Sequence, residues 1–380
     1  MFHLLYKWFY DPDTALRFLR LFNLEPFRAL CAAMTAFAVV YLVMPWFIRA
    51  MRRAGVSEQA RHYSELDAGH KSAVPTMGGL VVLPAIILSA LLWCNPTSAY
   101  VLLPLGVGAC GGLLGVLDDV AKVRHKGSDH GLSRATKYTA QIAIGAALGV
   151  ALLSPILSPI DSFEISGSFY LPFIKFGYFI GWANVAVVVL FLVISTNAVN
   201  LTDGMDGLAA VPSILVFLVL AIFAYVIGDS ESAKYLQFFP YVEGGQLVNH
   251  SLPGAGELAV LCCAGAGACA GFLWYNAFPA TVMMGDTGAL GLGALLGAAA
   301  VLIRQEGVFL IAGGVFILEL GSSFIQDYVG LKLLGRRIFF RAPFHSSMLH
   351  RGISENKVTV RMWILSAALA VAALSMLKLR

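Results

Sequence analysis

Long runs of apolar residues recur along the chain, each bounded by charged residues or by clusters of Gly, Pro and Asn. A run of about 20 apolar residues is long enough for a helix to cross a lipid bilayer. The runs predict ten membrane-spanning helices, at approximately 28–48, 77–93, 99–117, 138–156, 173–195, 207–227, 257–275, 287–303, 307–329 and 359–378. The pattern therefore predicts an all-α integral membrane protein.

The composition agrees with this pattern. Of the 380 residues, 58% are hydrophobic and 13% are charged, with a mean hydropathy of +0.78. Because soluble domains carry about 25% charged residues, a water-soluble enzyme is excluded. A disordered chain is excluded by the same excess of apolar residues, and a net charge of +4 does not indicate a nucleic-acid binder.

The basic residues predict an orientation. Of the 26 Lys and Arg residues, 17 follow odd-numbered spans and 9 lie on the opposite side. Because basic loops stay in the cytoplasm, both termini are expected outside. Charges such as Asp11 and Arg17 exclude a signal peptide, so residues 1–24 are predicted to lie at the interface and 25–380 to form a single polytopic domain.

Acidic residues close the third span, in the segment Leu117-Asp118-Asp119-Val120-Ala121-Lys122. If this end is helical, Asp118 and Lys122 share a face and Asp119 is turned about 100° away. Two adjacent acids repel each other unless a cation or a proton lies between them. A solvated helix end with one ion pair is the alternative explanation.

Two further acidic turns follow later spans. Asn200, Asp203 and Asp206 are spaced three apart, so on a helical turn they would line one side and offer the oxygen ligands that Mg²⁺ prefers. Asp286 lies between Gly285 and Gly288 just before a helix, where it suits either a phosphate site or a plain N-cap. All three turns fall on the predicted cytoplasmic side.

Basic segments lie on the same side, at 71–79 and 336–345. Such residues usually determine topology, but near an acidic Mg²⁺ site they also suit a diphosphate substrate. The combination indicates phosphoryl transfer from a soluble phosphorylated donor to an acceptor dissolved in the bilayer.

Five motifs, in this order, resemble those of the phospho-N-acetylmuramoyl-pentapeptide transferases (the MraY family) of the polyprenyl-phosphate N-acetylhexosamine 1-phosphate transferase superfamily. They lie at 75–79 (PTMGG), 117–122 (LDDVAK), 197–207 (NAVNLTDGMDG), 285–288 (GDTG) and 337–345 (RIFFRAPFH).

The resemblance implies transfer of phospho-MurNAc-pentapeptide from UDP-MurNAc-pentapeptide to undecaprenyl phosphate, which gives lipid I and UMP. This is the first membrane step of peptidoglycan synthesis. The resemblance also implies Mg²⁺ as cofactor, a homodimer, and a multi-pass location in the bacterial inner membrane with the active-site cleft facing the cytoplasm. No nucleic-acid partner is expected.

Positions that match the family motifs carry the implied roles. The catalytic group comprises Asp118, Asp119, Asp286 and His345. The metal ligands are Asp203 and Asp286. The substrate-binding group comprises Lys71, Thr76, Lys122, Asn200, Asp206, Asn276, Met283 and Gln326. Direct in-line attack is expected, with one of the paired acids as general base.

The sequence departs from the family pattern in two places. Ser346 and Ser347 replace the second and third of three consecutive histidines, and Met283 replaces an aromatic residue under the uracil ring. Both changes are expected to weaken contacts with the nucleotide or its inhibitors, and neither affects the carboxylates. The alternatives are a polyprenyl-phosphate GlcNAc-1-phosphate transferase, a lipid-intermediate transporter and an inactive scaffold.

Overall fold

The computed structural model describes residues 1–11, 13, 15–56, 74–124, 131–171, 173–174, 176–243 and 246–378. Within these ranges, eight helices are long and apolar enough to cross a membrane. They are α2 (Glu25–Arg53), α5 (Ala99–Arg124), α6 (Arg134–Leu153), α8 (Asn184–Thr202) with the short η3 (Gly181–Ala183) before it, α9 (Ala210–Gly228), α11 (Gly256–Asn276), α12 (Gly285–Leu302) and α16 (Glu355–Ser375). The predicted all-α membrane fold is confirmed.

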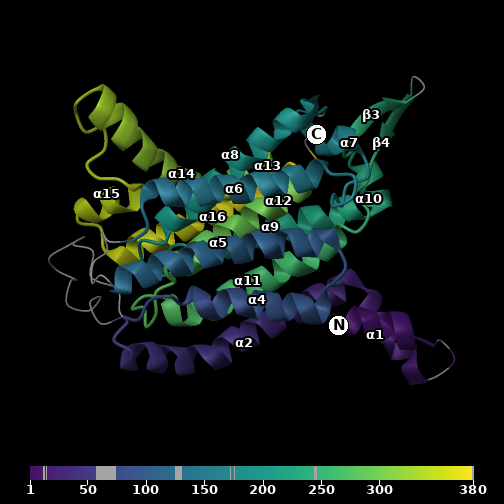
Figure 1. The fold of residues 1–380 in the computed structure, drawn as a ribbon, viewed down its shortest axis with the longest axis horizontal. Coiled ribbons are helices and arrows are strands. Elements are labelled where there is room, and N and C mark those ends of the chain that lie inside the picture. The colour runs from purple at the N-terminus through teal and green to yellow at the C-terminus, as the bar shows by residue number, and fades with distance from the viewer. Residues whose placement is uncertain are drawn as a thin grey trace.

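The remaining two predicted spans take less regular forms. Helix α4 (Gly79–Trp93) is apolar but has only 15 residues. Helices α13 (Glu306–Ala312) and α14 (Gly314–Phe324) are bent by 83° at Gly313, and the π-helix η4 (Ile325–Leu333) continues α14. In Figure 1 this continuation projects from the bundle beside α15 (Phe344–His350).

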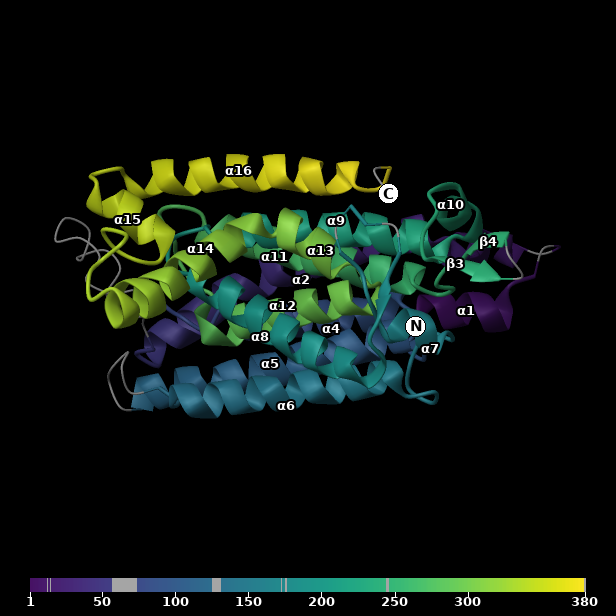
Figure 2. The ribbon, with the colours of Figure 1, turned by 90° about the horizontal axis from the view of Figure 1, so that it is seen from above.

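The long helices run roughly parallel, with both termini toward the same end of the bundle (Figures 1 and 2). Short elements gather near that end: α1 (Phe2–Phe9), η1 (Ala15–Asn23), α7 (Phe163–Ser166), α10 (Ser230–Tyr235), the hairpin β1–β2 (Ser168–Phe169 with Tyr178–Phe179) and the hairpin β3–β4 (Pro240–Glu243 with Gln246–Asn249). The acidic end of α5 and helix α15 lie at the opposite end.

Helix α12 is the centre of the bundle, and 94% of its most apolar window is buried. Its sequence GDTGALGLGALLGAAAVL is rich in small residues, which let neighbouring backbones approach closely in a membrane protein. Helices α4, α5 and α8 pack around it. This packing brings the start of α12 to the last turns of α5.

Two local expectations are wrong. The fifth span was expected to begin near residue 173, but Tyr178–Phe179 pairs as β2 with β1, and the helix begins only after Gly181, whose φ is +56°. Asn200, Asp203 and Asp206 were expected on one helical turn. Helix α8 instead ends at Thr202, and the chain turns at Asp203, where ψ is 44°. Asp206 therefore lies beyond the end of α8 and does not share a helical face with Asn200.

The N-terminal segment forms two short helices, α1 and η1. The ring of Phe2 stacks on Trp93 at 4.5 Å, and the N-terminal amine donates hydrogen bonds to the carbonyl oxygens of Leu91 and Leu92 at 2.6 and 2.9 Å. These contacts hold α1 against the end of α4. Its place at the membrane interface, and the division of the chain at residue 24, stay predictions.

Candidate active site

Two carboxylates and two ammonium groups form the centre of the site. Lys122 Nζ lies 2.7 Å from Asp118 Oδ2 and 3.0 Å from Asp286 Oδ2, and Lys137 Nζ makes the same two contacts at the same distances. Each ammonium group therefore bridges both acids. The predicted pairing of Asp118 with Lys122 across one helical turn is confirmed.

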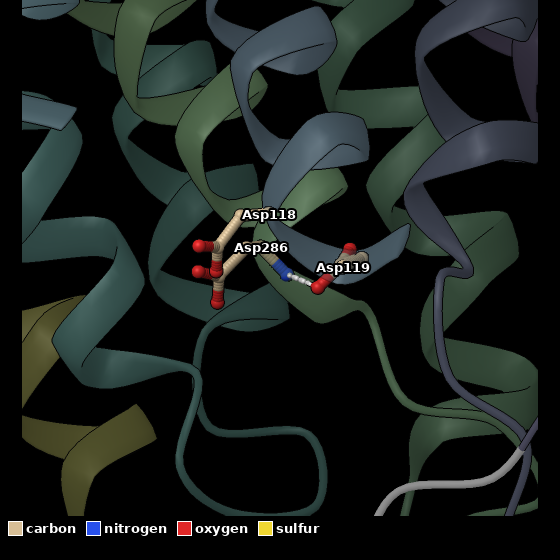
Figure 3. A group of neighbouring side chains, drawn as sticks. All are labelled: Asp118, Asp119 and Asp286. Carbon is tan, nitrogen blue, oxygen red and sulfur yellow. Dashed lines mark hydrogen bonds between the residues drawn. The ribbon is translucent and has the colours of Figure 1, made fainter. Parts of the chain in front are cut away.

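Asp119 is turned toward different partners. One of its oxygens accepts a hydrogen bond from the backbone N–H of Asp286 at 3.1 Å, and the other accepts from the Thr287 N–H at 2.9 Å and the Thr287 hydroxyl at 2.7 Å. Figure 3 shows Asp118 and Asp286 side by side, whereas Asp119 reaches the start of α12. Asp119 thus caps N–H groups that the first turn of any helix leaves unpaired.

Glycines permit this close arrangement. A Cβ added at Gly115 would lie 2.2 Å from the Asp286 carbonyl oxygen, so only glycine lets α5 approach α12 at this point. Gly285 has a φ of +74°, which favours glycine, and a Cβ there would lie 2.9 Å from an Asp119 oxygen. The same added atom would lie 3.1 Å from the Thr76 hydroxyl, which places half-buried Thr76 at the edge of the acidic cluster.

Gly131 and Leu132, just before α6, lie against Asp118. The backbone N–H of Leu132 donates a hydrogen bond to Asp118 Oδ1 at 2.7 Å. Asp118 is fully buried, while the side chains of Lys122 and Lys137 are each 21% exposed. The lysines are therefore the groups of this cluster that an incoming anion can reach most easily.

A second polar cluster surrounds Asp206, with Asn276 beside it. Asp206 Oδ2 accepts a hydrogen bond from the Ala280 N–H at 2.9 Å, and Asn276 Oδ1 accepts from the Gly207 N–H at 3.0 Å. The Asn276 amide donates to the Val282 carbonyl at 2.9 Å. These bonds hold the loop between α11 and α12 against the turn after α8.

Met283 is buried in that loop. Its N–H donates to the Pro75 carbonyl at 2.8 Å, and its own carbonyl accepts from the Gly78 N–H at 2.9 Å. The segment 75–79 is thereby paired with 283–284, so the first and fourth family motifs lie side by side.

His345 is buried next to Glu319. Its Nδ1 lies 3.1 Å from Glu319 Oε2, and its backbone N–H donates to the same carboxylate at 3.2 Å. A Cβ added at Gly204 would lie 2.7 Å from His345 Nε2. The imidazole is therefore oriented by Glu319 and directed at the turn that follows Asp203. The replacing residues Ser346 and Ser347 are buried beside it, whereas His350 is exposed and packs near Phe340.

The other predicted site residues are less closely connected to the carboxylates. Gln326 is buried, and its Oε1 accepts hydrogen bonds from the N–H groups of Ile338 and Phe339, so it shapes the loop before α15. Asn200 and Asp203 are half-buried at the end of α8. Lys71 lies outside the described residues.

Sequence reasoning missed Lys137 and did not assign a role to Glu319. Lys137 was counted only as a loop charge, but a lysine one turn inside an apolar helix is itself a signal, because burying an ammonium group requires a partner. Glu319 was recognised only as a carboxylate inside the ninth span, away from the span ends where most other acids lie. Its partner, His345, is 26 residues away and was not foreseen from spacing.

The three carboxylates can hold a metal ion. Ligand oxygens of Asp118, Asp119 and Asp286 lie within 4.8 Å of one another, and Asp203 is not part of this group. All the ligand atoms are carboxylate oxygens, which suit a hard divalent cation. The partners of Asp119 are the backbone and a hydroxyl of α12, whereas Asp118 Oδ2 and Asp286 Oδ2 face lysine side chains that an ion can replace, so Asp118 and Asp286 fit such an ion best.

Comparisons with known proteins identify the family. Residues 101–304 match the family model "Glycosyl transferase family 4". The chain is 40% identical over 369 residues to the phospho-N-acetylmuramoyl-pentapeptide-transferase of Methylacidiphilum infernorum, covering 95% of this chain and 96% of the relative. It is 39% identical over 378 residues to the protein of the same name from Oleidesulfovibrio alaskensis and 40% identical over 379 residues to the one from Neisseria gonorrhoeae. Both alignments cover 99% of this chain and 100% of the relative. The resemblance drawn from five motifs is confirmed. The chain belongs to glycosyl transferase family 4 and, within it, to the phospho-N-acetylmuramoyl-pentapeptide-transferases.

Proposed function

We propose that the protein transfers phospho-MurNAc-pentapeptide from UDP-MurNAc-pentapeptide to undecaprenyl phosphate, yielding lipid I and UMP. The observation that carries the proposal is the pair of lysines bridging Asp118 and Asp286 at the end of a membrane-spanning helix. A site at the end of a membrane-spanning helix can bind a diphosphate from the water and the phosphate of a lipid in the bilayer. The relatives carry the name of this activity, which favours it over transfer of GlcNAc-1-phosphate.

In this reaction an oxygen of the lipid phosphate attacks the phosphorus that carries the sugar, and the bond from that phosphorus to the UMP oxygen breaks. One phosphoanhydride bond forms as another breaks, so the catalyst lowers the barrier. Lys122 and Lys137 would bind the phosphate oxygens, because their ammonium groups are the exposed cations of the site. Asp118, which faces both lysines, would position the attacking phosphate and accept any proton that it carries.

Asp286 and Asp118 would hold Mg²⁺. Bound there, the ion would neutralise the donor diphosphate and stabilise the transferring phosphoryl group. Asp119 would act through the backbone by fixing the start of α12, and with it Asp286. Asp203 remains a further candidate ligand at the neighbouring turn.

The second polar cluster would take the nucleoside and sugar. It joins the turn after α8 to the loop between α11 and α12 through Asp206 and Asn276. Met283 would lie under the base as a soft, non-stacking contact. His345, held by Glu319, would contact the diphosphate side of the pocket. Active-site access from the cytoplasm and assembly as a homodimer belong to the same proposal.

The test is transfer by purified protein from labelled UDP-MurNAc-pentapeptide to undecaprenyl phosphate, with Mg²⁺ or with EDTA. UDP-GlcNAc is included as a competing donor. We expect lipid I and UMP only with Mg²⁺, and a loss of about 100-fold or more in Asp286→Asn. Asp229→Asn is the matched control, because Asp229 lies at the start of α10, where an Asn also caps the helix. The proposal would be contradicted if the protein used UDP-GlcNAc but not UDP-MurNAc-pentapeptide as donor. It would also be contradicted if correctly folded protein transferred from neither donor.

A further inference from the structure

Lys122 and Lys137 share the same two carboxylate oxygens. Each ammonium nitrogen lies 2.7 Å from Asp118 Oδ2 and 3.0 Å from Asp286 Oδ2. The two ammonium groups carry together the charge of one divalent cation, and the two carboxylates carry the opposite charge. The lysines therefore neutralise these acids to the same extent as a divalent cation would.

The contacts at Asp118 Oδ2 depend on charge and not on directed hydrogen bonds. This oxygen is buried and takes no hydrogen bond of ordinary geometry from any described residue, although both Nζ atoms lie 2.7 Å away. The other oxygen, Oδ1, accepts a hydrogen bond from the Leu132 N–H. Asp118 Oδ2 can therefore take a metal ion in place of the ammonium groups and lose no hydrogen bond by the exchange.

The acids are fixed, and the lysines are the groups that can move. The Leu132 N–H holds Asp118, and Asp119 holds the backbone N–H of Asp286. Both acids are buried, whereas each lysine side chain is 21% exposed and ends a flexible four-carbon stem. An exchange of cations at this point therefore requires only that two side chains turn outward.

We propose that Lys122 and Lys137 are stand-in cations: they hold Asp118 and Asp286 until a divalent cation binds, then turn away and bind phosphate oxygens of the substrates. The proposal rests on the proposed function, which supplies the phosphates. Because a bound phosphate draws the lysines from the acids, and a bound metal ion frees the lysines for phosphate, each strengthens the binding of the other. In the alternative, the lysines are permanent props that stay paired with the two acids.

The first test follows the lysines themselves. The purified protein is methylated with formaldehyde and a borane reductant, with Mg²⁺ or with EDTA, and the modified lysines are mapped by mass spectrometry. We expect Mg²⁺ to make Lys122 and Lys137 react about tenfold faster, the size of effect that losing a close ion-pair partner has in proteins. Lys234, exposed on α10 at the other end of the bundle, is the internal control and should react equally in both conditions. Unchanged or slower methylation of the two site lysines with Mg²⁺ would overturn the proposal.

The second test measures metal affinity without substrate. Mn²⁺ serves as a paramagnetic substitute for Mg²⁺, and the unbound ion is counted by electron paramagnetic resonance. We expect Lys137→Gln to bind Mn²⁺ about tenfold more tightly than the wild type, because a competing positive charge is gone. Lys234→Gln, the matched control, should bind as the wild type does, and Asp286→Asn should lose the site. Equal or weaker binding by Lys137→Gln is the result expected of a permanent prop and would overturn the proposal, as would full binding by Asp286→Asn.

The third test repeats the Mn²⁺ titrations with undecaprenyl phosphate. We expect the lipid phosphate to tighten Mn²⁺ binding about tenfold in the wild type and by less in Lys137→Gln, where one competing charge is already gone. An equal gain in both proteins would overturn the proposal. Transfer by Lys137→Gln should fall although its metal site is tighter, a combination that a loss of folding does not give. The binding measurements require no turnover, so lysine exchange in a protein that transfers from neither donor would count against the proposed function alone.

Discussion

Asp118 and Asp119 are neighbours in the chain but have different surroundings. Asp118 faces two ammonium groups that an incoming anion can also bind, whereas both oxygens of Asp119 accept hydrogen bonds from the start of α12. A carboxylate that accepts three such bonds in a buried position is committed to holding structure. The two acids of one motif therefore have separate roles.

Substituting each acid by its amide separates these roles. In Asp119→Asn the new NH₂ group faces backbone N–H donors, so we expect unfolding to become easier by about 1–3 kcal/mol and transfer to fall with it. In Asp118→Asn we expect a smaller loss of stability, because both lysines are partly exposed and keep Asp286 as a partner, and we expect transfer to fall by about 100-fold or more. Thermal unfolding in detergent, measured beside kcat, checks both. Equal thermal midpoints for the two variants would contradict this assignment.

The sequence motifs predicted which acidic residues belong to the site, but they did not predict all of the contacts that these acids make. Asp118 and Lys122 were paired correctly because four residues span one helical turn. Lys137 was missed because its partners, Asp118 and Asp286, come from other helices, and local spacing carries no information about such contacts. Asp206 was misplaced because α8 stops at Thr202, one turn earlier than a continuous pattern suggested.

At the scale of elements, the site depends on how closely α5 approaches α12. Gly115 contacts the backbone of Asp286, where an added Cβ would lie 2.2 Å from the carbonyl oxygen. The neighbour is backbone and cannot rotate away, so a methyl group there must push the helices apart. Because Asp286 and Thr287 are held by Asp119 on the same helix as Gly115, the displacement would act directly on the acidic cluster.

We therefore expect Gly115→Ala to destabilise the protein by about 1–3 kcal/mol, the usual cost of overpacking. We also expect it to lower kcat. Gly106→Ala is the control on the same helix, since a Cβ there meets nothing within 4 Å, and Ala is the better helix former. Its thermal midpoint should equal or exceed that of the wild type. A Gly115→Ala protein as stable and active as the control would show that the helices can separate without affecting the site.

The apolar runs predicted where helices lie better than where they begin and end. Helix α5 continues to Arg124, beyond the predicted end at 117, because a helix can carry polar residues once their partners are supplied by neighbours. The ninth span bends by 83° at Gly313, and composition alone shows no proline there to mark it. The fifth span begins later than the predicted residue 173 because Tyr178 and Phe179 form a strand of the β1–β2 hairpin, whose strands are only two residues long.

For the whole molecule, the acidic site and the termini lie toward opposite ends of the bundle (Figure 1). Basic residues of the described chain are concentrated at the site end, among them Arg52 and Arg53 at the end of α2, Arg124 at the end of α5 and Arg134 at the start of α6. The rule that basic loops remain in the cytoplasm therefore predicts that the site lies inside and both termini lie outside.

Reporter fusions test this orientation. With alkaline phosphatase, which is active only outside, a fusion after the last residue should be active and a fusion after Arg124 inactive. With green fluorescent protein, which fluoresces only inside, the two results should be reversed. The full-length fusion must also retain transfer activity, so that the reporter records the native arrangement. A fluorescent C-terminal fusion in an active protein would contradict this orientation, because it would place Asp286 on the outer face, where the cell supplies no nucleotide-linked donor. The basic residues at the site end would then be explained by phosphate binding and not by topology.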